Sequence, residues 1–441
     1  MQIRRKNFLA LSGIAATTGV LAACGGSSDS GSDSSSGGSD AGGSSEGAAP
    51  ERADADLVIW TDEVKAGALE GPAQDWAKAN NLTVAVQIVA DDLQGNFITA
   101  NQAGNGPDMI VAAHDWIGNL VQNSAISPVQ LPSGASDAIA PVGLEAVTYD
   151  GQTYGAPYAV ETLVLYANNE LTDVPEPSTV EELVEAGEAG GAENVLSLPV
   201  GEEGDAYHMQ PFYTSGGGYL FGEDSEGNLD PSDVGVGQEG SIAAAEKIGE
   251  LGEQGVLKTS ISNDNAISLF TDGNAAYLIS GPWALADIRT AEVDFTMSQV
   301  PGFEGMDPAV PFAGVNAFFV ASSGANQAFA QQFAADVVSS PDIAEAMFPG
   351  NELPPVNLEL QEKLTGEYPD VVRVAEYAED ASPMPAIPEM AAIWEPLGQA
   401  EANLVGGADA ESTMTSAGEC AEIVCTTRDR ARCLVRNLRV V

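Results

Sequence analysis

Apolar residues in the first part of the chain recur at two different spacings. Leu57–Trp60 and Leu82–Val89 are short runs of the kind that buried strands show, and Asp108–Ala113 is a third. Ala66–Ala79 has the apolar spacing of an amphipathic helix, and Phe97 lies in a following helical stretch. Strands that alternate with helices over such lengths predict parallel βαβ units, and therefore an α/β fold.

The second half of the chain continues the same alternation. Ser178, with Glu181 three residues later, forms a capping box, which predicts a helix that runs through Glu185. The pattern also predicts helices over residues 241–252, 265–270 and 327–338, and strands over residues 275–280 and 318–321. We find no repeat of fixed period, which argues against a solenoid.

Two pairs of polar residues directly follow predicted strands. Thr61 and Asp62 come after the first strand, and His114 and Asp115 come after the third. The carboxyl ends of parallel strands meet at one edge of a sheet, and α/β sheets bind their ligands at this edge. We therefore expect both pairs to lie at the same rim.

Composition narrows the class of protein. The chain has 441 residues, with 65 acidic against 16 basic side chains and a formal net charge of −49. This length is enough for two or three globular units, and 44% hydrophobic residues are too many for a disordered chain. Such an acidic surface would repel phosphates, which argues against nucleic acid as a partner. We interpret the excess of acidic side chains as a solubilising feature of the surface, which gives little information about a ligand.

The N-terminus has the pattern of an export signal followed by a lipid attachment site. A basic start and the apolar stretch over residues 8–22 are typical of a signal peptide and too short for a stable membrane span. The segment ending at Cys24 resembles a bacterial lipobox, so we predict removal of residues 1–23 and lipidation of the Cys24 thiol. Residues 24–52 are rich in Gly, Ser and Asp, which predicts a flexible tether. The protein would be exported and lipid-anchored at the outer face of the cell membrane; general secretion and the twin-arginine route both stay open.

The last residues, 415–441, differ in composition from the rest. Cys420, Cys425 and Cys433 follow a long stretch without cysteine, and arginines are concentrated near the C-terminus. The cysteine spacing matches no zinc-binding pattern, so we predict no metal site there. A basic interaction tail and a shift of reading frame at the end of the gene would both explain the change, and we assign the segment no function.

Short motifs along the chain occur in the order and spacing of one protein family. They are Val58-Ile59-Trp60, Gly106-Pro107-Asp108-Met109-Ile110, Ala113-His114-Asp115, Ala159-Val160-Glu161, Gly281-Pro282-Trp283-Ala284 and Met384-Pro385-Ala386-Ile387-Pro388-Glu389-Met390. From about residue 55 to about residue 414 the chain resembles the maltose/maltodextrin-binding lipoproteins that serve ABC importers. Each motif alone is weak support, whereas the complete set in register is specific.

The resemblance implies an α/β fold of the type II periplasmic-binding-protein class, in which two lobes are joined by a hinge and enclose a ligand cleft. One lobe would comprise residues 53–160 and 315–365, and the other residues 161–314 and 366–414. Closure of the lobes around a ligand is the motion that such proteins make. The resemblance further implies a monomer that uses no cofactor or metal and performs no chemistry on its ligand.

The resemblance also implies a set of ligand contacts whose chemistry suits a sugar. A sugar ring presents apolar C–H faces and a belt of hydroxyl groups, so its site needs flat aromatic rings and paired acceptors. The expected ligand residues are Asp62, Lys65, Asp115, Trp116, Glu161, Asp205, Tyr207, Trp283 and Trp394.

Each of these residue types has an ordinary structural alternative. Large aromatic residues such as Trp283 and Trp394 are more often part of a core. Asp115 would serve equally as a helix cap, and Glu161 as a structural bond between lobes. An ionised carboxylate that grips two hydroxyl groups forms charge-assisted bonds, and we therefore favour sugar binding for both acids. We expect His114, next to Asp115, to have a structural role.

Several positions depart from the family pattern. The best-known members carry an arginine where this chain has Trp116, a tryptophan in place of Ala112, and an aspartate in place of Val64. They also carry a tyrosine in place of Glu395, an arginine in place of Gly398, and a glutamate in place of Asp205. These departures leave the outer part of the pocket open, and with it the preferred chain length and linkage of the sugar.

The function implied by the resemblance is capture of maltose or malto-oligosaccharides and their delivery to the membrane permease subunits of an ABC importer. One alternative keeps the fold and changes the ligand to another oligosaccharide, such as trehalose or a β-linked glycan. The other is a glycoside hydrolase acting through two of the acids Asp115, Glu161 and Asp205, although the chain carries no established hydrolase signature.

Overall fold

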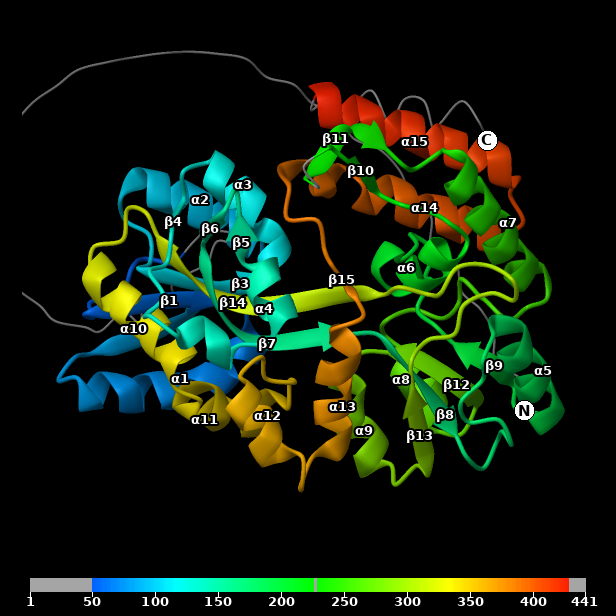
Figure 1. Ribbon diagram of the computed structural model, residues 1–441, viewed down its shortest axis with the longest axis horizontal. Helices are drawn as coiled ribbons and strands as arrows, with labels where there is room; N and C mark the ends of the chain where they lie inside the picture. The colour runs from blue at the N-terminus through cyan, green and yellow to red at the C-terminus, as the bar shows by residue number, and fades with distance from the viewer. Residues whose placement is uncertain (1–49, 226–227, 428–441) are drawn as a thin grey trace, which may run out of the picture. The chain divides into compact units, whose positions relative to one another are not determined.

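The first sheet contains strand β1 and lies in the left half of Figure 1. The computed structural model describes residues 50–225 and 228–427, with side chains as far as residue 423. Strand β1 (Leu57–Thr61) pairs in parallel with β2 (Val84–Ile88) and with β3 (Met109–Ala113). Helices α1 (Glu63–Ala79) and α2 (Leu93–Ala103) connect these strands. The parallel βαβ units expected from the apolar spacing are therefore confirmed.

Strand β14 (Phe312–Ala321) is the long central strand of this sheet. It pairs antiparallel with β3, with β4 (Ile126–Ser127) and with β7 (Gly155–Thr162), and parallel with β15 (Ser382–Pro383). The sequence predicted only its second part, residues 318–321. Every residue of β14 is buried, because neighbouring strands and the layers above and below cover it along its whole length. Its partners are distant in the sequence, so local periodicity did not reveal them.

The second sheet has the strand order β13-β8-β12-β9. Its strands are β13 (Phe295–Ser298), β8 (Val164–Asn168), β12 (Ala275–Ser280) and β9 (Asn194–Ser197). One face packs in a core with α5 (Val180–Gly190), α6 (Ala206–Ser215), α7 (Glu239–Glu253), α14 (Trp394–Val405) and α15 (Ala410–Thr427). The other face joins a larger core that includes α8 (Ala266–Thr271), α9 (Leu285–Thr290) and the interior of the first sheet.

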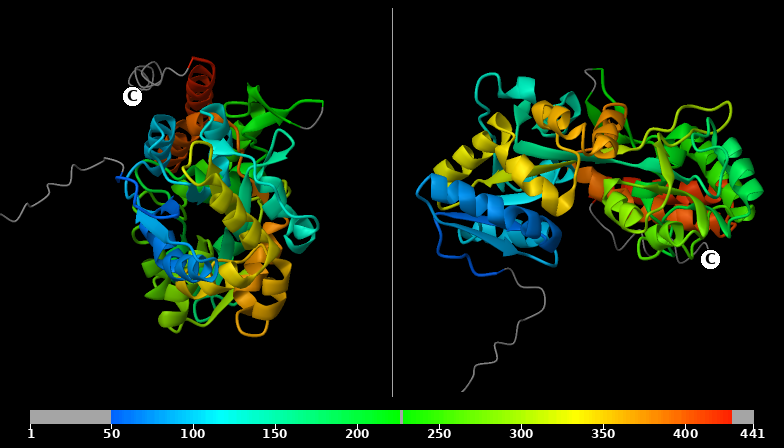
Figure 2. Two further views of the ribbon diagram at one scale, coloured as in Figure 1. Left: turned by 90° about the vertical axis from the view of Figure 1, so that its left-hand side faces the viewer. Right: turned by 90° about the horizontal axis from the view of Figure 1, so that it is seen from below.

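The remaining elements cover the first sheet or form small hairpins. The helices are α3 (Ile117–Gln122), α4 (Pro141–Ala146), α10 (Gln327–Ser339), α11 (Asp342–Asn351), α12 (Leu358–Leu364) and α13 (Pro369–Ala378). The hairpins are β5 (Thr148–Tyr149) with β6 (Gln152–Thr153), and β10 (Phe221–Glu223) with β11 (Leu229–Val234). Figure 2 shows the same arrangement from two further sides.

Two segments run directly from one sheet to the other. Strand β7 of the first sheet continues through Leu163 into β8 of the second, and the loop after β13 enters β14 at Phe312. An ion-pair cluster also links elements around these crossings: Arg289 of α9 bonds Asp370 of α13 at 2.7 Å and also bonds Glu352.

Two details of the predicted elements are corrected. The capping box of α5 is shifted by one residue: Thr179 accepts a hydrogen bond from the Glu182 N–H, and Glu182 accepts one from the Ser178 N–H. Thr179, not Ser178, is therefore the N-cap. Helix α1 also begins earlier than predicted, because Asp62 caps it.

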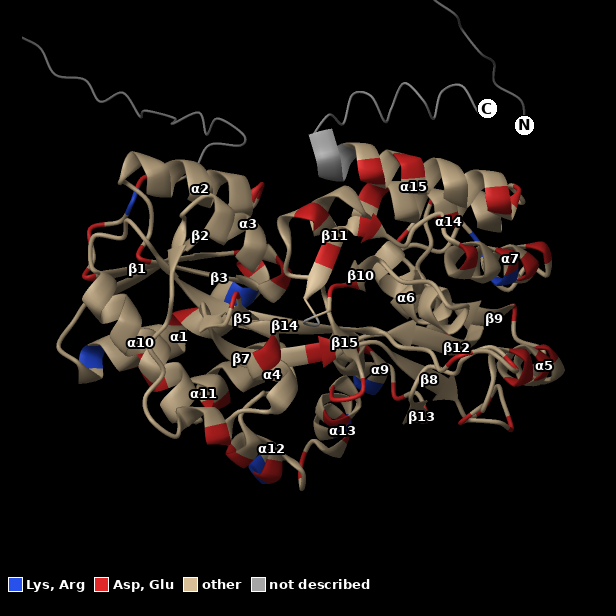
Figure 3. Cartoon of the chain, turned by 45° about the horizontal axis from the view of Figure 1, so that its top comes forward, with Lys and Arg blue, Asp and Glu red and all other residues tan. Residues whose placement is uncertain are grey.

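The predictions for the two chain ends are tested only in part. The signal segment, Cys24, Cys425 and Cys433 lie outside the residues whose side chains are described. Helix α15 extends into the segment with unusual composition, where Ala417 and Cys420 are buried and Cys420 is disulfide-bonded. Among the described residues, no helix is both long and apolar enough to cross a membrane. Figure 3 shows acidic residues on outer helices such as α5, α7 and α11, in keeping with a solubilising surface.

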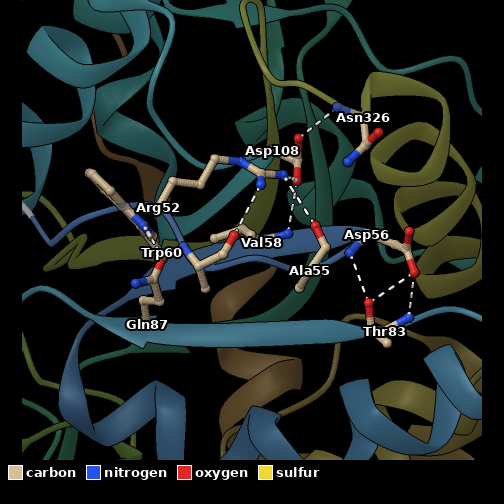
Figure 4. Close-up of polar contacts among 10 residues, drawn as sticks. Arg52, Ala55, Asp56, Val58, Trp60, Thr83, Gln87, Asp108 and Asn326 are labelled. Atoms are coloured by element: carbon tan, nitrogen blue, oxygen red, sulfur yellow. Dashed lines mark hydrogen bonds and ion pairs between the residues drawn. The ribbon is translucent and has the colours of Figure 1, made fainter.

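A buried ion pair fastens the segment before β1 to the first sheet (Figure 4). The Arg52 Nη2 lies 2.7 Å from the Asp108 Oδ2, and the Asp108 side chain is 0% exposed. Asp108 also accepts backbone hydrogen bonds from Val58 and from Asn326, both at 2.8 Å. The carboxylate thus joins the start of the fold, the strand β1 and the loop before α10.

A second buried acid, Glu401 of α14, has no such partner. Its side chain is 0% exposed, and neither carboxylate oxygen bonds another residue in the described part of the chain. Burial, with the nearby charge of Asp205, raises the pKa of Glu401 well above its usual value. The folded protein therefore keeps a proton on Glu401 that the unfolded chain loses above about pH 4.5.

Replacing Glu401 by glutamine is expected to stabilise the protein at neutral pH. Because the folded state holds the extra proton, this group makes the wild-type stability fall as the pH rises from 4.5 toward the raised pKa. The loss is at most about 1.4 kcal/mol per pH unit. Denaturant unfolding at several pH values measures the free energy of unfolding of both proteins. Glu401→Gln should be more stable than the wild type at pH 7 and equally stable at pH 4. An equal difference at both values would show that Glu401 does not titrate this way.

Candidate functional site

The end of β1 places Asp62 and Lys65 at the rim of the first sheet. Asp62 caps α1, since its Oδ1 accepts a hydrogen bond from the backbone N–H of Lys65 at 2.9 Å. Its Oδ2 accepts a second bond from the Lys65 Nζ at 2.6 Å. Burial acts to raise the pKa of Asp62, but the bonds to Lys65 outweigh it and hold the pKa below its usual value. These two expected ligand residues are paired with each other and remain partly exposed.

The end of β3 places His114, Asp115 and Trp116 in one short turn, η1 (His114–Trp116). Since β3 is the parallel neighbour of β1, the expectation that both polar pairs share one rim is confirmed. His114 is buried and accepts a hydrogen bond from the Val315 N–H, while its Nε2 lies 3.1 Å from the Met384 carbonyl oxygen. Burial lowers the pKa of His114 to about 4, so the ring is neutral and its role is structural, as predicted.

Asp115 is half-buried and does not cap a helix, because neither η1 nor α3 has a side-chain capping bond. The capping alternative is therefore wrong. Burial raises the pKa of Asp115 to about 6, although a hydrogen bond from its own backbone acts against this. The Asp115 carboxylate caps neither helix and keeps acceptor capacity for further hydrogen bonds. The neighbouring Trp116 is half-buried against the larger core.

Glu161 lies on β7, directly opposite Gly314 of β14. A side chain at Gly314 would come within 2.9 Å of the Glu161 Cγ, so the glycine makes room for the carboxylate. The amide of Asn316, on the same strand, donates a hydrogen bond to Glu161. Burial raises the pKa of Glu161 to about 7, and the negative charge of Asp115 acts in the same direction. The positive charge of Lys65 and the hydrogen bond from Asn316 act to lower the pKa. Glu161 thus has one structural bond and keeps further acceptor capacity.

These electrostatic effects show which expected residues lie close together. The charge of Lys65 and that of Asp115 both act on Glu161. Burial raises the pKa of Tyr207, and the charges of Glu161 and Asp115 raise it further. Tyr207 belongs to α6, beside the second sheet. Residues from both sheets therefore meet in one region, with the acids on one side and Tyr207 on the other.

An aromatic cluster forms the second side of this region, and we call it the aromatic wall. Its members are Tyr207, His208, Trp283, Phe312 and Trp394. Tyr207 stacks on Phe312, with centroids 5.9 Å apart and planes at 26°, and Phe312 meets Trp394 edge-to-face at 5.6 Å. Tyr207 also lies 6.4 Å from Trp283. Three of the four expected aromatic residues thus belong to one surface, in which Phe312 joins Tyr207 to Trp394.

Trp283 is the exposed member of the aromatic wall. It sits in the turn η3 (Pro282–Ala284) after β12 and is 36% exposed, which is unusual for so large an apolar side chain. Its indole folds over Gly281, where a Cβ would lie only 2.1 Å from the ring. The alternative that Trp283 is a core residue is therefore wrong, and part of the ring is open to solvent.

Asp205 differs from the other expected ligand residues because its hydrogen bonds are made within the protein. It caps α6 by accepting the His208 N–H at 3.1 Å, and it also accepts the His208 Nδ1 at 2.9 Å and the Asn263 amide at 2.8 Å. Burial acts to raise the pKa of Asp205, but the His208 bonds outweigh it and lower the pKa. Its carboxylate holds His208 in place.

Three residues of this region were missed from sequence alone. Phe312 and Asn316 lie on the part of β14 that apolar periodicity did not separate from its neighbours, so their contacts come from strand pairing across the chain. His208 had one local signal: it comes three residues after Asp205, the spacing of a side chain that bonds its own helix cap.

The structure shows what surrounds three of the positions that depart from the family pattern. Gly398 of α14 packs against the backbone of Gly204, and a Cβ on Gly204 would lie 1.6 Å from the Gly398 carbonyl oxygen. This close approach of two backbones occupies the space beside Gly398. Val64 is 73% exposed at the rim, and Ala112 is buried within β3.

A half-open cavity of about 630 Å³ lies away from these residues. It is lined by the loop over residues 299–311, by Leu163 where the chain passes between the sheets, and by Tyr377 and Asp380 near the end of α13. It contains none of the expected ligand residues. In the described part of the chain, no group of three or more His, Cys, Asp or Glu is placed to hold a metal ion.

The chemistry of the region follows from its two sides. Asp115 and Glu161 are half-buried acceptors that can receive hydroxyl protons, and charge-assisted hydrogen bonds of this kind are stronger than neutral ones. Trp283 supplies a flat apolar face, and Trp394 and Tyr207 extend it. A ligand with an apolar face and hydroxyl groups along its edges fits both sides at once.

Comparison with known proteins gives a consistent result. Residues 73–379 match the family of bacterial extracellular solute-binding proteins. A galactooligosaccharide-binding protein of Bacillus subtilis (strain 168) is 27% identical over 419 residues, which cover 92% of this chain and 94% of that protein. The maltodextrin-binding protein MdxE of the same organism is 27% identical over 390 residues, which cover 83% of this chain and 89% of that protein.

A solved structure extends the similarity to three dimensions. The crystal structure of a cyclo/maltodextrin-binding protein in complex with maltotetraose superposes with a TM-score of 0.73 at 25% identity. The match covers 84% of this chain and 97% of that one. The expected α/β fold of the two-lobed type II periplasmic-binding class is thereby confirmed.

Proposed function

Because this chain belongs to the family of bacterial extracellular solute-binding proteins, we propose that it captures malto-oligosaccharides and delivers them to an ABC permease. The observation that carries the proposal is the pairing of two half-buried, available carboxylates, Asp115 and Glu161, with the exposed indole of Trp283. The relatives named for maltodextrin, and the structural neighbour that holds maltotetraose, support this choice of ligand.

In the proposed mode of binding, sugar rings stack on Trp283, Trp394 and Tyr207. Their hydroxyl groups donate to Asp115 and Glu161, and Lys65 and Asp62 bind at the outer rim. A micromolar dissociation constant corresponds to about −8.2 kcal/mol, which a few net hydrogen bonds and two stacked rings can supply. Because the sugar touches residues beside both sheets, it favours the closed arrangement of the lobes.

The division into lobes and the attachment to the membrane are part of the same proposal. We place residues 53–160 with 315–365 in one lobe and residues 161–314 with 366–414 in the other. Lipidation at Cys24 would hold a monomeric protein at the outer face of the cell membrane, where the permease meets it. The name of a streptococcal relative, a maltooligosaccharide ABC transporter solute-binding lipoprotein, supports both the anchor and the partner.

One observation favours a second candidate ligand. A relative whose match covers 92% of this chain is named for galactooligosaccharides. Val64 at the outer rim and Gly398 in α14 both depart from the maltodextrin-binding pattern, and we propose that these positions help to select between the two sugars.

Isothermal titration calorimetry with maltose, maltotriose and longer dextrins, beside a galactooligosaccharide, tests the proposal. We expect binding of at least one malto-oligosaccharide with one sugar per chain. Binding of the galactooligosaccharide alone would replace the ligand and keep the fold and transport role. We also propose that the protein performs no chemistry, so prolonged incubation with maltotriose should release no glucose; release of glucose would favour the hydrolase alternative.

Affinity should fall as the pH is lowered. Ionised Asp115 and Glu161 accept hydroxyl protons best, and their pKa values are raised to about 6 and about 7 by burial. Binding is therefore strongest above pH 7 and weakens as each acid takes up a proton, by about tenfold or more between pH 8 and pH 5. Calorimetry over this range measures it, with circular dichroism to check the fold. The double variant Asp115→Asn, Glu161→Gln should bind more weakly with a nearly flat profile; an unchanged slope would exclude these acids as its source.

A further inference from the structure

Two polar atoms of the aromatic wall have no hydrogen-bond partner among the described residues. They are the hydroxyl oxygen of Tyr207 and the Nε2 of His208, and both are shielded from solvent. Buried polar atoms in proteins are nearly always hydrogen-bonded, so each exception calls for an explanation. The Tyr207 ring and the His208 ring lie 5.5 Å apart, which places both exceptions in the same part of the site.

The orientation of His208 is determined by its neighbours. The Nδ1 lies 2.9 Å from the Asp205 Oδ2, and that carboxylate is held in turn by the Asn263 amide at 2.8 Å. A carboxylate accepts but cannot donate, so the proton lies on Nδ1 and, in the neutral ring, Nε2 is an acceptor. The imidazole cannot turn over without losing this bond. Its free nitrogen is therefore presented to the wall in a defined direction.

The position of His208 beside Trp283 connects this nitrogen with the stacking surface. The two ring centroids are 6.0 Å apart, with the planes nearly perpendicular at 82°. Trp283 is the neighbour with freedom to move, since it is 36% exposed while His208 is 6% exposed. A ligand that displaces the indole slightly opens the surroundings of the imidazole ring.

A sugar hydroxyl suits both unpartnered atoms. A hydroxyl group donates one hydrogen bond and accepts others, so it can donate to the His208 Nε2 or accept from the Tyr207 O–H. A water molecule would satisfy the same atoms, but it would lack the ring that stacks on Trp283.

We propose that His208 is a ligand-contact residue whose Nε2 accepts a hydrogen bond from a hydroxyl of the sugar ring that stacks on Trp283. Asp205 is then a positioning residue that orients the imidazole and does not itself touch the sugar. The inference deepens the proposed function and rests on it. It assigns hydroxyl recognition at this end of the site to a residue that the sequence motifs did not single out.

This contact has a consequence for specificity. A buried acceptor that is satisfied by the ligand is left unpaired when the ligand lacks that hydroxyl, and such sites reject deoxy analogues strongly. The wild-type protein should therefore bind one monodeoxy analogue of maltotriose about tenfold or more weakly than maltotriose itself. The position of that missing hydroxyl identifies the group that His208 recognises.

The test compares two substitutions at His208 by calorimetry with maltotriose and its monodeoxy analogues. His208→Phe keeps a flat ring without an acceptor, and His208→Gln keeps an acceptor oxygen. We expect His208→Phe to bind maltotriose about tenfold more weakly and to lose the discrimination against the critical analogue, and His208→Gln to recover part of both. Full discrimination in His208→Phe would overturn the inference. Thermal unfolding checks that both variants fold.

A measurement on the wild-type protein keeps the test decisive if His208→Phe does not fold. The chain has 2 histidines, so the imidazole nitrogen signals of ¹⁵N-histidine-labelled protein are few, and buried His114 with its two backbone contacts serves as the internal control. On addition of maltotriose, the Nε2 signal of His208 should shift while that of His114 stays in place. An unmoved His208 signal in a protein saturated with sugar would contradict the proposal.

The experiments distinguish a failure of the proposed function from a failure of the proposed His208 contact. If calorimetry shows that the wild-type protein binds only the galactooligosaccharide, the labelled-histidine titration and the variants are measured with that sugar and judged by the same criteria. Sugar binding with His208 unaffected ends this inference alone. Failure to bind any sugar of the panel ends the proposed function and the inference together.

Discussion

Replacing Trp283 by alanine is expected to weaken malto-oligosaccharide binding by a factor of ten or more while the protein stays folded. The indole is 36% exposed and folds over Gly281, so its removal leaves the cores of both sheets intact. Stacking on an aromatic ring contributes about 1–3 kcal/mol in related cases of bases and cations, and each 1.4 kcal/mol is tenfold in affinity. Calorimetry measures the loss, and an unchanged isotherm would show that the ring does not touch the ligand.

A glycine substitution tests the orientation of the same ring. In Gly281→Ala the new methyl carbon would lie 2.1 Å from the indole, so the ring must turn away although it remains present. The backbone at Gly281, with φ −91°, accepts alanine without strain. Binding should weaken less than in Trp283→Ala, and tryptophan fluorescence should change. Gly67→Ala in α1, where a Cβ meets nothing within 4 Å, is the matched control and should bind as the wild type does.

Replacing Arg52 by methionine is expected to lower the free energy of unfolding by about 3 kcal/mol, because it leaves a buried charge without its partner. Asp108 is 0% exposed and would keep only its backbone bonds from Val58 and Asn326. The remaining Arg52 side chain is 19% exposed, so we take the lower end of the range for buried ion pairs. Denaturant unfolding measures the change, and sugar affinity should stay within about twofold because the pair lies outside the proposed site.

An exposed ion pair supplies the control for this substitution. Lys363 bonds Glu345 on the surface, with the two side chains 60% and 39% exposed. Exposed pairs contribute about 0–1 kcal/mol, so Lys363→Met should change the stability little. If Arg52→Met and Lys363→Met had equal, small effects, burial of Asp108 would not carry the stabilisation that we assign to it.

The part of the site that could be predicted follows from short-range rules. Asp62 and Asp115 were expected at one rim because each follows an apolar run, and parallel strands end at the same edge of a sheet. The capping role of Asp205 was also within reach, since a helix-capping acid is bonded by a residue three positions later. We had expected Asp205 to contact the ligand because the family has an acid there, and its bonds to His208 and Asn263 favour a supporting role.

Other features depended on contacts between distant segments. Phe312 joins Tyr207 to Trp394 because β14 extends well beyond its predicted bounds, and the pairing of β14 with β3, β7 and β15 has no signal in local spacing. The raised pKa values of Asp115 and Glu161 come from burial, which depends on what the fold places around each carboxylate. The same is true of Glu401, an acid in a helix that the sequence presents as unremarkable.

The amino-acid sequence by itself determined the α/β class, the alternation of strands and helices, and the family, because these depend on periodicity and on short motifs that keep their order. Only the tertiary structure decided which acids are available to a ligand, which ring is exposed, and which polar atoms lack a partner. Those properties arise from neighbours that lie far apart along the chain, and burial changes the charge, the hydrogen-bonding capacity and the freedom of a side chain after the fold has brought its neighbours together.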